Sequence, residues 1–217
     1  MIQSGKFDSP KMNIKKLGNS VLIFTIKRLI EVIGIFIFCL GVLLFLALVS
    51  YSPTDPNFIF PKNAVINNLL GFQGSYISDL FIQSAGLITY LIPVTYIFTG
   101  ANIFKKKEIF LLIENTFFII LYSLVGSLFL SYYYKNTFSL YINGNGGFIG
   151  NFFNETFLKN IIASNENIFY YFFIILTIIF FLVSINFNIK NFIQLIKNAI
   201  QFLFKKENKN YTNKNEI

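Results

Sequence analysis

The sequence predicts an all-α membrane protein with four transmembrane helices, over about residues 30–50, 78–104, 113–134 and 167–187. The 217 residues are 54% hydrophobic and only 13% charged, whereas about a quarter of a typical soluble domain is charged. Four long runs nearly free of charge match the roughly 20 residues that a helix needs to cross a bilayer. Turn-forming or basic segments separate these runs, so each helix has a place to end.

The composition argues against several kinds of site. A single cysteine, Cys39, allows no disulfide framework and no cysteine-based metal site. The chain has no histidine, the commonest metal ligand and the usual proton carrier near neutral pH. We therefore predict no catalytic, cofactor-binding or metal site in these residues.

Residues 1–28 are predicted to be a basic tail before the first span. The end of the tail has apolar residues at helical spacing, so it is either an interfacial helix on anionic lipid headgroups or a partly ordered tail. The eighteen residues from Val32 to Val49 carry no charge and would measure roughly 27 Å as a helix. Glu31 follows Lys27 by four residues and Arg28 by three, which predicts an ion pair within the helix at the membrane boundary.

A turn-rich segment ends the first span. Pro53 and Pro56, with Ser, Thr, Asp and Asn around them, cannot continue a helix and favour turns. We predict that residues 50–79 form a hairpin that leads into the second span. The hairpin has many apolar residues, which we expect to pack either as a cap on the chain itself or on a membrane or protein partner.

The second span contains a proline and follows an acidic residue. Pro93 predicts a kink, because its nitrogen cannot donate a hydrogen bond to the carbonyl of Thr89. Asp79 is expected in the opening turn of this helix, where the helix dipole favours a carboxylate. We favour this capping role over ion binding.

Small residues recur along the third span, which follows three consecutive lysines at positions 105–107. Ser123, Ser127 and Ser131 are spaced by four residues, and Gly126 lies beside them. Small side chains at this spacing allow another helix to approach closely. The pattern predicts a packing face.

A glycine-rich loop, residues 143–150, comes before the fourth span. No Gly-Lys-Ser or Gly-Lys-Thr follows it, so the loop does not have the pattern of a phosphate-binding loop. Residues 148–162 are predicted to form a short amphipathic helix or a re-entrant segment. The spans define a membrane domain over residues 29–188, followed by a basic amphipathic helix over 189–206 and a disordered tail over 207–217.

The basic residues predict the orientation in the membrane. Fifteen of the 18 Lys and Arg residues lie before the first span, between the second and third, or after the fourth. Such residues are enriched on the cytoplasmic side of membrane proteins. We therefore expect both termini in the cytoplasm and the turn and glycine loop on the opposite side.

Motifs spread over this pattern resemble the N-terminal membrane domain of the FtsK/SpoIIIE family of bacterial septal DNA translocases. The resemblance covers roughly residues 20–190, with Ser75 and Ser78 where alanines are more usual. The residues that carry it are Tyr51, Ser52, Pro53, Asp55, Pro56, Gly71, Gly74, Tyr76, Asp79, Leu80, Pro93, Gly146, Gly147 and Gly150.

The resemblance implies a membrane-anchoring and septum-targeting role in cell division and chromosome segregation, at the bacterial inner membrane. It makes the hairpin and the segment after the glycine loop periplasmic, and the basic amphipathic flanks cytoplasmic. It also implies divisome membrane proteins as partners and a homo-oligomer, a hexamer in the family. Direct binding of nucleic acid is not expected from this segment.

The alternative is a small polytopic transporter or permease subunit without a septal role. Every acidic residue lies at the edge of a predicted span or in a loop, and the chain has no histidine, which argues against a transporter or an enzyme. No P-loop occurs in these residues, so the family's DNA-pumping motor is not among them. Whether the chain is a natural short protein, half of a split gene or an excised fragment stays open, as do the partners and the oligomeric state.

Overall fold

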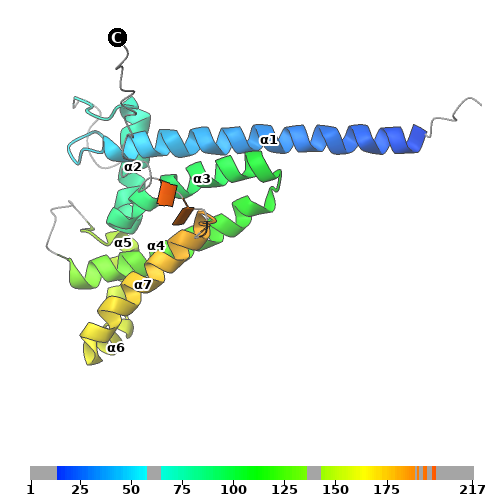
Figure 1. Cartoon of the computed structure of the whole chain (residues 1–217). Helices are drawn as coiled ribbons and strands as arrows, with labels where there is room; N and C mark the ends of the chain where they lie inside the picture. The colour runs from blue at the N-terminus through cyan, green and yellow to red at the C-terminus, as the bar shows by residue number, and fades with distance from the viewer. Residues whose placement is uncertain are drawn as a thin grey trace, which may run out of the picture. The chain divides into compact units, whose positions relative to one another are not determined.

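The computed structural model describes residues 14–57, 65–135 and 143–188, followed by Lys190, Ile193, Gln194, Lys197 and Asn198; side chains are described from residue 19 onward. The chain divides into two units, residues 1–186 and 187–217. Every regular element of the described residues is helical (Figure 1). The elements are α1 (Ile14–Val49), α2 (Gly71–Ala85), the 3₁₀ helix η1 (Gly86–Tyr90), α3 (Leu91–Lys106), α4 (Phe110–Tyr133), α5 (Gly147–Asn154), α6 (Leu158–Ser164) and α7 (Glu166–Ser184).

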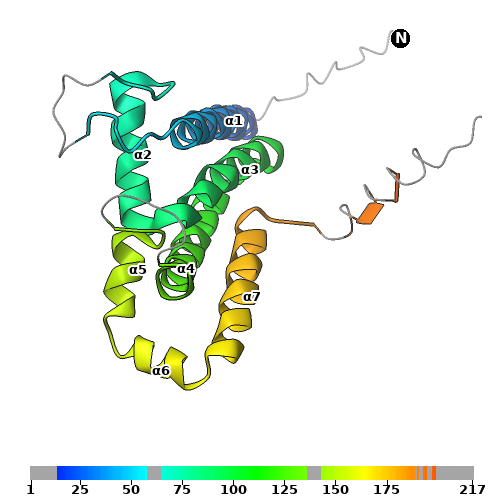
Figure 2. The ribbon, with the colours of Figure 1, turned by 90° about the vertical axis from the view of Figure 1, so that its left-hand side faces the viewer.

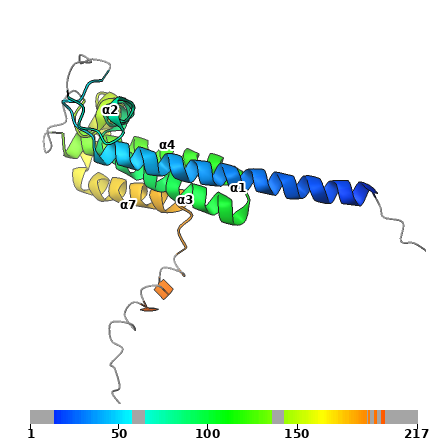
Figure 3. The same cartoon turned by 90° about the horizontal axis from the view of Figure 1, so that it is seen from above.

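Four helical segments are long and apolar enough to cross a membrane: Asn19–Val49, Gly71–Lys106, Phe110–Tyr133 and Glu166–Ser184. This confirms the predicted all-α fold with four membrane-crossing helices. Figure 3 shows α1, α3, α4 and α7 running in similar directions, with α2 seen end-on. In the second unit, the five described residues from Lys190 to Asn198 have helical backbone; the rest of the predicted 189–206 helix, the tail 207–217 and residues 1–13 lie outside the described residues.

The first helix is longer than the sequence predicted. We expected a boundary at residue 28, but α1 runs without a break from Ile14 to Val49. Its 36 residues measure about 54 Å, against roughly 30 Å for the hydrocarbon core. The charged residues near position 28 are good helix formers, and no proline interrupts them. The helix therefore continues where the sequence changes from charged to apolar.

Glycines bring α1 and α3 into backbone contact. A Cβ atom on Gly41 would lie 2.8 Å from the backbone nitrogen of Ile97, and one on Gly34 would lie 2.8 Å from that of Phe104. On the facing helix, a Cβ on Gly100 would overlap the backbone of Phe38. Small residues allow this approach, which increases van der Waals contact between helices in a membrane.

The second membrane segment bends much more sharply than we predicted, and at another residue. Figures 1 and 2 show α2 lying crosswise to α1 and α3. The bend begins at Gly86, which has φ +73°, and continues through η1. Pro93 is the third residue of α3, where its missing N–H costs no helical hydrogen bond. The predicted kink in the second span is therefore present, but the bend begins at Gly86, seven residues before Pro93.

The second half of the unit pairs α4 with α7 through large side chains. Leu128 and Phe173 form a buried cluster with Ile162 of α6. Residues 148–162, which we predicted as one segment, form two short helices, α5 and α6, separated by Glu155–Phe157. Figure 2 shows α5 close to α2 at the end of the helices.

Candidate functional site

The candidate site is the turn end of the unit, which we define as residues 50–57, residues 65–90 and the glycine loop 143–151. At its centre lies the carboxylate of Asp55, whose residue is 1% exposed. The carboxylate accepts hydrogen bonds from the backbone N–H of Asn67 (2.9 Å), the side chain of Asn67 (3.0 Å) and the backbone N–H of Asn68 (2.9 Å). A buried charge is tolerated only with such partners, so Asp55 fixes the return of the hairpin.

Asn68 joins the hairpin to the end of α1. Its side-chain amide donates to the carbonyl of Ala47 at 2.8 Å and to that of Ser50 at 3.3 Å. These bonds satisfy carbonyls that the end of a helix leaves without intrahelical partners. Gly74 lies against Asn68, and a Cβ at this position would overlap its side chain. A glycine is therefore needed at position 74, because any larger residue would overlap the side chain of Asn68.

Further bonds join α2 to the turn. The hydroxyl of Ser75 donates to the carbonyl of Pro56 at 2.8 Å, and the hydroxyl of Tyr51 donates to Oδ1 of Asp79 at 3.2 Å. Burial, and then the nearby carboxylate of Asp79, raise the pKa of Tyr51 above its usual value. The predicted capping role of Asp79 is wrong, because α2 begins eight residues earlier, at Gly71, and Asp79 lies within the helix.

The glycine loop packs on the bend between α2 and η1. The backbone N–H of Leu87 donates to the carbonyl of Asn145 at 2.9 Å. A Cβ on Gly86 would overlap this carbonyl, and one on Gly147 would lie 2.5 Å from the nitrogen of Gly86. Gly147 also has φ +65°. Gly86 and the glycine loop, which lie about 60 residues apart in the chain, therefore form one contact.

The small residues of α4 hold this contact from the side of the membrane helices. The hydroxyl of Ser127 donates to the carbonyl of Ala85 at 2.7 Å, and that of Ser131 donates to Asn151 at 2.7 Å. Gly146 and Gly150 approach the same two serines so closely that a Cβ on either would overlap them. Gly126 faces Ile88, whereas the buried hydroxyl of Ser123 has no hydrogen-bond partner.

Other motif residues lie outside this cluster. Ser52 contacts Thr54 (2.9 Å between the hydroxyl oxygens), and Leu80 is exposed. Tyr76 lies beside Phe72, with 6.4 Å between the ring centroids. Pro53 is a half-buried turn residue, and Gly71 begins α2 with φ +64°. Pro93 faces Gly41 of α1.

A polar network that the sequence analysis missed joins α3, α4 and α7. Thr95 Oγ1 lies 3.2 Å from the hydroxyl of Tyr122 and 3.0 Å from that of Ser184. One turn farther along α3, Thr99 accepts a hydrogen bond from the side chain of Asn115 on α4 at 2.8 Å. The Asn115 side chain in turn accepts one from Asn186 at 3.2 Å. All six side chains are uncharged. Such bonds specify which helices pair, and they offer no group that ionises near neutral pH.

An ionic contact marks the other end of the helices. Glu31 of α1 pairs with Arg28 at 2.5 Å and with Lys107, which follows α3, at 2.7 Å. The sequence predicted the partner within α1 but not Lys107. Across the described ranges, no group of three or more His, Cys, Asp or Glu residues is placed to hold a metal ion.

Comparison with known proteins agrees with these motifs. Residues 26–197 match the family described as the 4TM region of DNA translocase FtsK/SpoIIIE. The chain belongs to this family. The match covers most of the chain and confirms the predicted resemblance to the FtsK/SpoIIIE membrane domain. The chain is thus a multi-pass membrane region of the FtsK-like translocase type.

The individual relatives are named DNA translocase FtsK. The chain is 40% identical to the one from Rickettsia bellii over 60 residues, which are 28% of this chain and 8% of the relative. It is 33% identical to the one from Shewanella oneidensis over 116 residues, which are 52% of this chain and 12% of the relative. The chain thus matches about a tenth of the length of these relatives. No solved structure matches it.

In this FtsK-like membrane region, the motif residues belong to two parts of the sequence that the fold brings together. Tyr51, Asp55, Gly74 and Asp79 lie around the hairpin, and the loop glycines lie on the bend that follows it. The sequence analysis missed Asn67, Asn68 and Asn145. Asparagine is so common in this chain that no local pattern set these three apart.

Proposed function

We propose that the chain anchors an FtsK-like DNA translocase in the bacterial inner membrane and targets it to the division septum. The single observation that carries the proposal is the turn end, where Asp55 is buried in hydrogen bonds and further motif residues, Tyr51, Pro56, Gly74 and Asp79, contact the same hairpin. A segment that only linked two membrane helices would need neither this length nor a buried carboxylate.

The bias of basic residues supports an orientation with both termini in the cytoplasm and the turn end in the periplasm. In this orientation the turn end faces membrane proteins of the divisome, which are its proposed partners. We also propose that the chain forms homo-oligomers, hexamers by the family relationship, and that it has no catalytic activity of its own. The polar network between α3, α4 and α7 is uncharged, and among the described residues no group of three or more His, Cys, Asp or Glu is placed to hold a metal ion.

Fluorescence imaging tests the proposal. The full chain, fused to a fluorescent protein at its C-terminus, is expected to form a midcell band in dividing cells of the bacterium that encodes it. The alternative role, a subunit of a small transporter, predicts uniform fluorescence of the envelope. A uniform envelope signal from an intact, membrane-inserted fusion would contradict septal targeting.

A further inference from the structure

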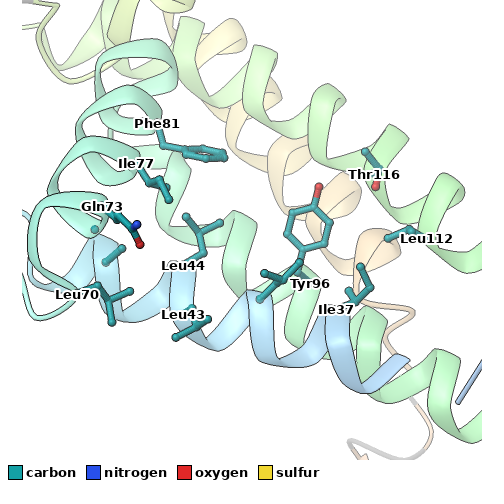
Figure 4. Close-up of a pocket in the computed structure, with 13 residues that line it drawn as sticks. Ile37, Leu43, Leu44, Leu70, Gln73, Ile77, Phe81, Tyr96, Leu112 and Thr116 are labelled. Atoms are coloured by element: carbon teal, nitrogen blue, oxygen red, sulfur yellow. The ribbon is translucent and has the colours of Figure 1, made fainter. Parts of the chain in front are cut away.

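An apolar groove of about 730 Å³ lies between the membrane helices and α2. It is lined along α1 from Ile37 to Ala47, by Leu70 and along α2 as far as Phe81, and by one residue of α3 and two of α4. Figure 4 shows Phe81, Ile77 and Leu44 pointing into it. This groove borders the turn end, since Ala47 and Gly74, which contact Asn68, line it. The proposed function does not use it.

The depth of the groove corresponds to one leaflet of a bilayer. The eleven residues from Ile37 to Ala47 rise about 15 Å, which is half of the roughly 30 Å hydrocarbon core. Helix α2 lies crosswise at the end of α1 (Figure 2), and Leu70, Gln73 and Gly74 line the groove at this end beside Ala47. Leu40 and Leu43 on the rim are 44% and 46% exposed. The groove is therefore continuous with the lipid-facing surface of α1.

One polar side chain marks the end of the groove where α2 lies crosswise. Gln73 lines the groove there and is exposed, and its amide has no hydrogen-bond partner within the described part of the chain. At the level where α1 ends, a phospholipid has its ester carbonyls, which accept hydrogen bonds, and its acyl chain continues into the hydrocarbon core. The depth of the groove and the position of the Gln73 amide both fit a phospholipid.

We propose that the groove binds one acyl chain of a phospholipid from the leaflet on the turn side, with the Gln73 amide donating a hydrogen bond to an ester carbonyl. The bound chain fills the space between α1 and α2 and supports the crosswise position of α2. The lipid thereby becomes a structural part of the turn end.

Tryptophan fluorescence tests this proposal, because the chain has no tryptophan of its own. Phe81→Trp places a probe in the groove, and Phe172→Trp, on the exposed face of α7, is the matched control. Each variant of the full chain is reconstituted in phosphatidylethanolamine and phosphatidylglycerol vesicles that contain phospholipid brominated on its acyl chains. We expect bromine to quench both probes in the bilayer. After transfer to lipid-free detergent, Phe81→Trp should stay quenched, whereas Phe172→Trp should lose its quenching.

Two outcomes would overturn the proposal. If only Phe172→Trp is quenched in the bilayer, the groove holds protein, such as a helix of a second copy that reaches the hydroxyls of Tyr96 and Thr116. If both probes lose their quenching in detergent, no lipid is retained. Ile77→Trp, on the rim, replaces Phe81→Trp if that variant does not elute as a monodisperse species.

A second variant tests the hydrogen bond. Gln73→Leu in the Phe81→Trp background should leave quenching in the bilayer unchanged and abolish its retention in detergent. Undiminished retention would show that Gln73 does not hold the lipid.

Discussion

At the residue scale, the structure of the hairpin depends most on the carboxylate of Asp55. It accepts three hydrogen bonds from two consecutive asparagines, and it lies in the turn between Pro53 and Pro56. The prolines stop the helix, but they do not determine where the chain goes next. The direction of the hairpin comes from the carboxylate, since it binds the chain again twelve residues later.

Asp55→Asn is expected to destabilise the protein by about 3 kcal/mol, because one carboxylate oxygen becomes an NH₂ group that faces backbone donors. Thermal unfolding in detergent, followed by loss of monodisperse elution, measures the change. Thr54→Ala, at the exposed neighbouring position, is the control and should unfold like the unaltered chain. Equal stability of Asp55→Asn and Thr54→Ala would show that the hydrogen bonds of Asp55 do not hold the hairpin.

Two serines of α4 provide a second comparison between single residues. Ser127→Leu forces a large side chain against Ala85 and the glycine loop and removes a 2.7 Å hydrogen bond, so a loss of about 3 kcal/mol is expected. Ser123→Ala removes a hydroxyl that has no partner and should change stability by less than about 1 kcal/mol. The folded yield in detergent measures both. A Ser127→Leu protein with normal yield would mean that this face of α4 does not require small residues.

At the scale of the elements, α1 and α3 are joined by glycine contacts that the sequence analysis did not identify. Two of the three glycines, Gly34 and Gly41, are seven residues apart on α1. The third, Gly100 on α3, lies more than fifty residues farther along the chain. No local pattern relates positions so far apart. The serine stripe of α4 was easier to find because its members repeat within one helix.

Gly100→Ala tests whether this contact sets the distance between the helices. In an open helix the change would stabilise by about 1 kcal/mol through helix propensity. Here the added methyl overlaps the backbone of Phe38, so a net loss of about 1–3 kcal/mol in thermal stability is expected. Gly126→Ala is the contrast, because the obstructing atoms belong to the movable side chain of Ile88. Its effect should be smaller. A stabilised Gly100→Ala protein would rule out the tight contact.

At the scale of the whole molecule, the sequence was sufficient for the number of membrane helices and insufficient for their arrangement. Length and absence of charge are local properties, so the four spans could be predicted. The crosswise position of α2 depends on Gly86 meeting Asn145, a contact between distant segments. The network around Asn115 also needs three helices in place before its members become neighbours.

The proposed orientation predicts which residues an impermeant thiol reagent can reach in intact cells. Cys39 is exposed and must first be replaced by alanine. Val65→Cys, in the hairpin, should then react from outside, whereas Glu108→Cys, in the turn between α3 and α4, should react only after the membrane is opened. Glu108 is chosen because acidic residues contribute little to orientation. Labelling of Glu108→Cys in intact cells would reverse the topology.

The hairpin also presents an apolar surface that suits partner recognition. Val65, Leu69 and Phe72 are 83%, 71% and 41% exposed, although they lie close in the chain to the asparagines that bind Asp55. Exposed apolar side chains on a fixed turn are typical of interaction sites. If they contact a divisome protein, replacing all three by serine should reduce the midcell band and the rate of division, without loss of stability, because none of the three side chains is buried.

The control for this last prediction is Phe157→Ser, an equally exposed apolar residue just before α6, which should leave localisation unchanged. Both variants are compared in cells that depend on this chain, and both must insert and elute as monodisperse species. If the triple serine variant localises and supports division like the unaltered chain, the hairpin is a cap on the helices. In that case its exposed side chains contact only the membrane interface.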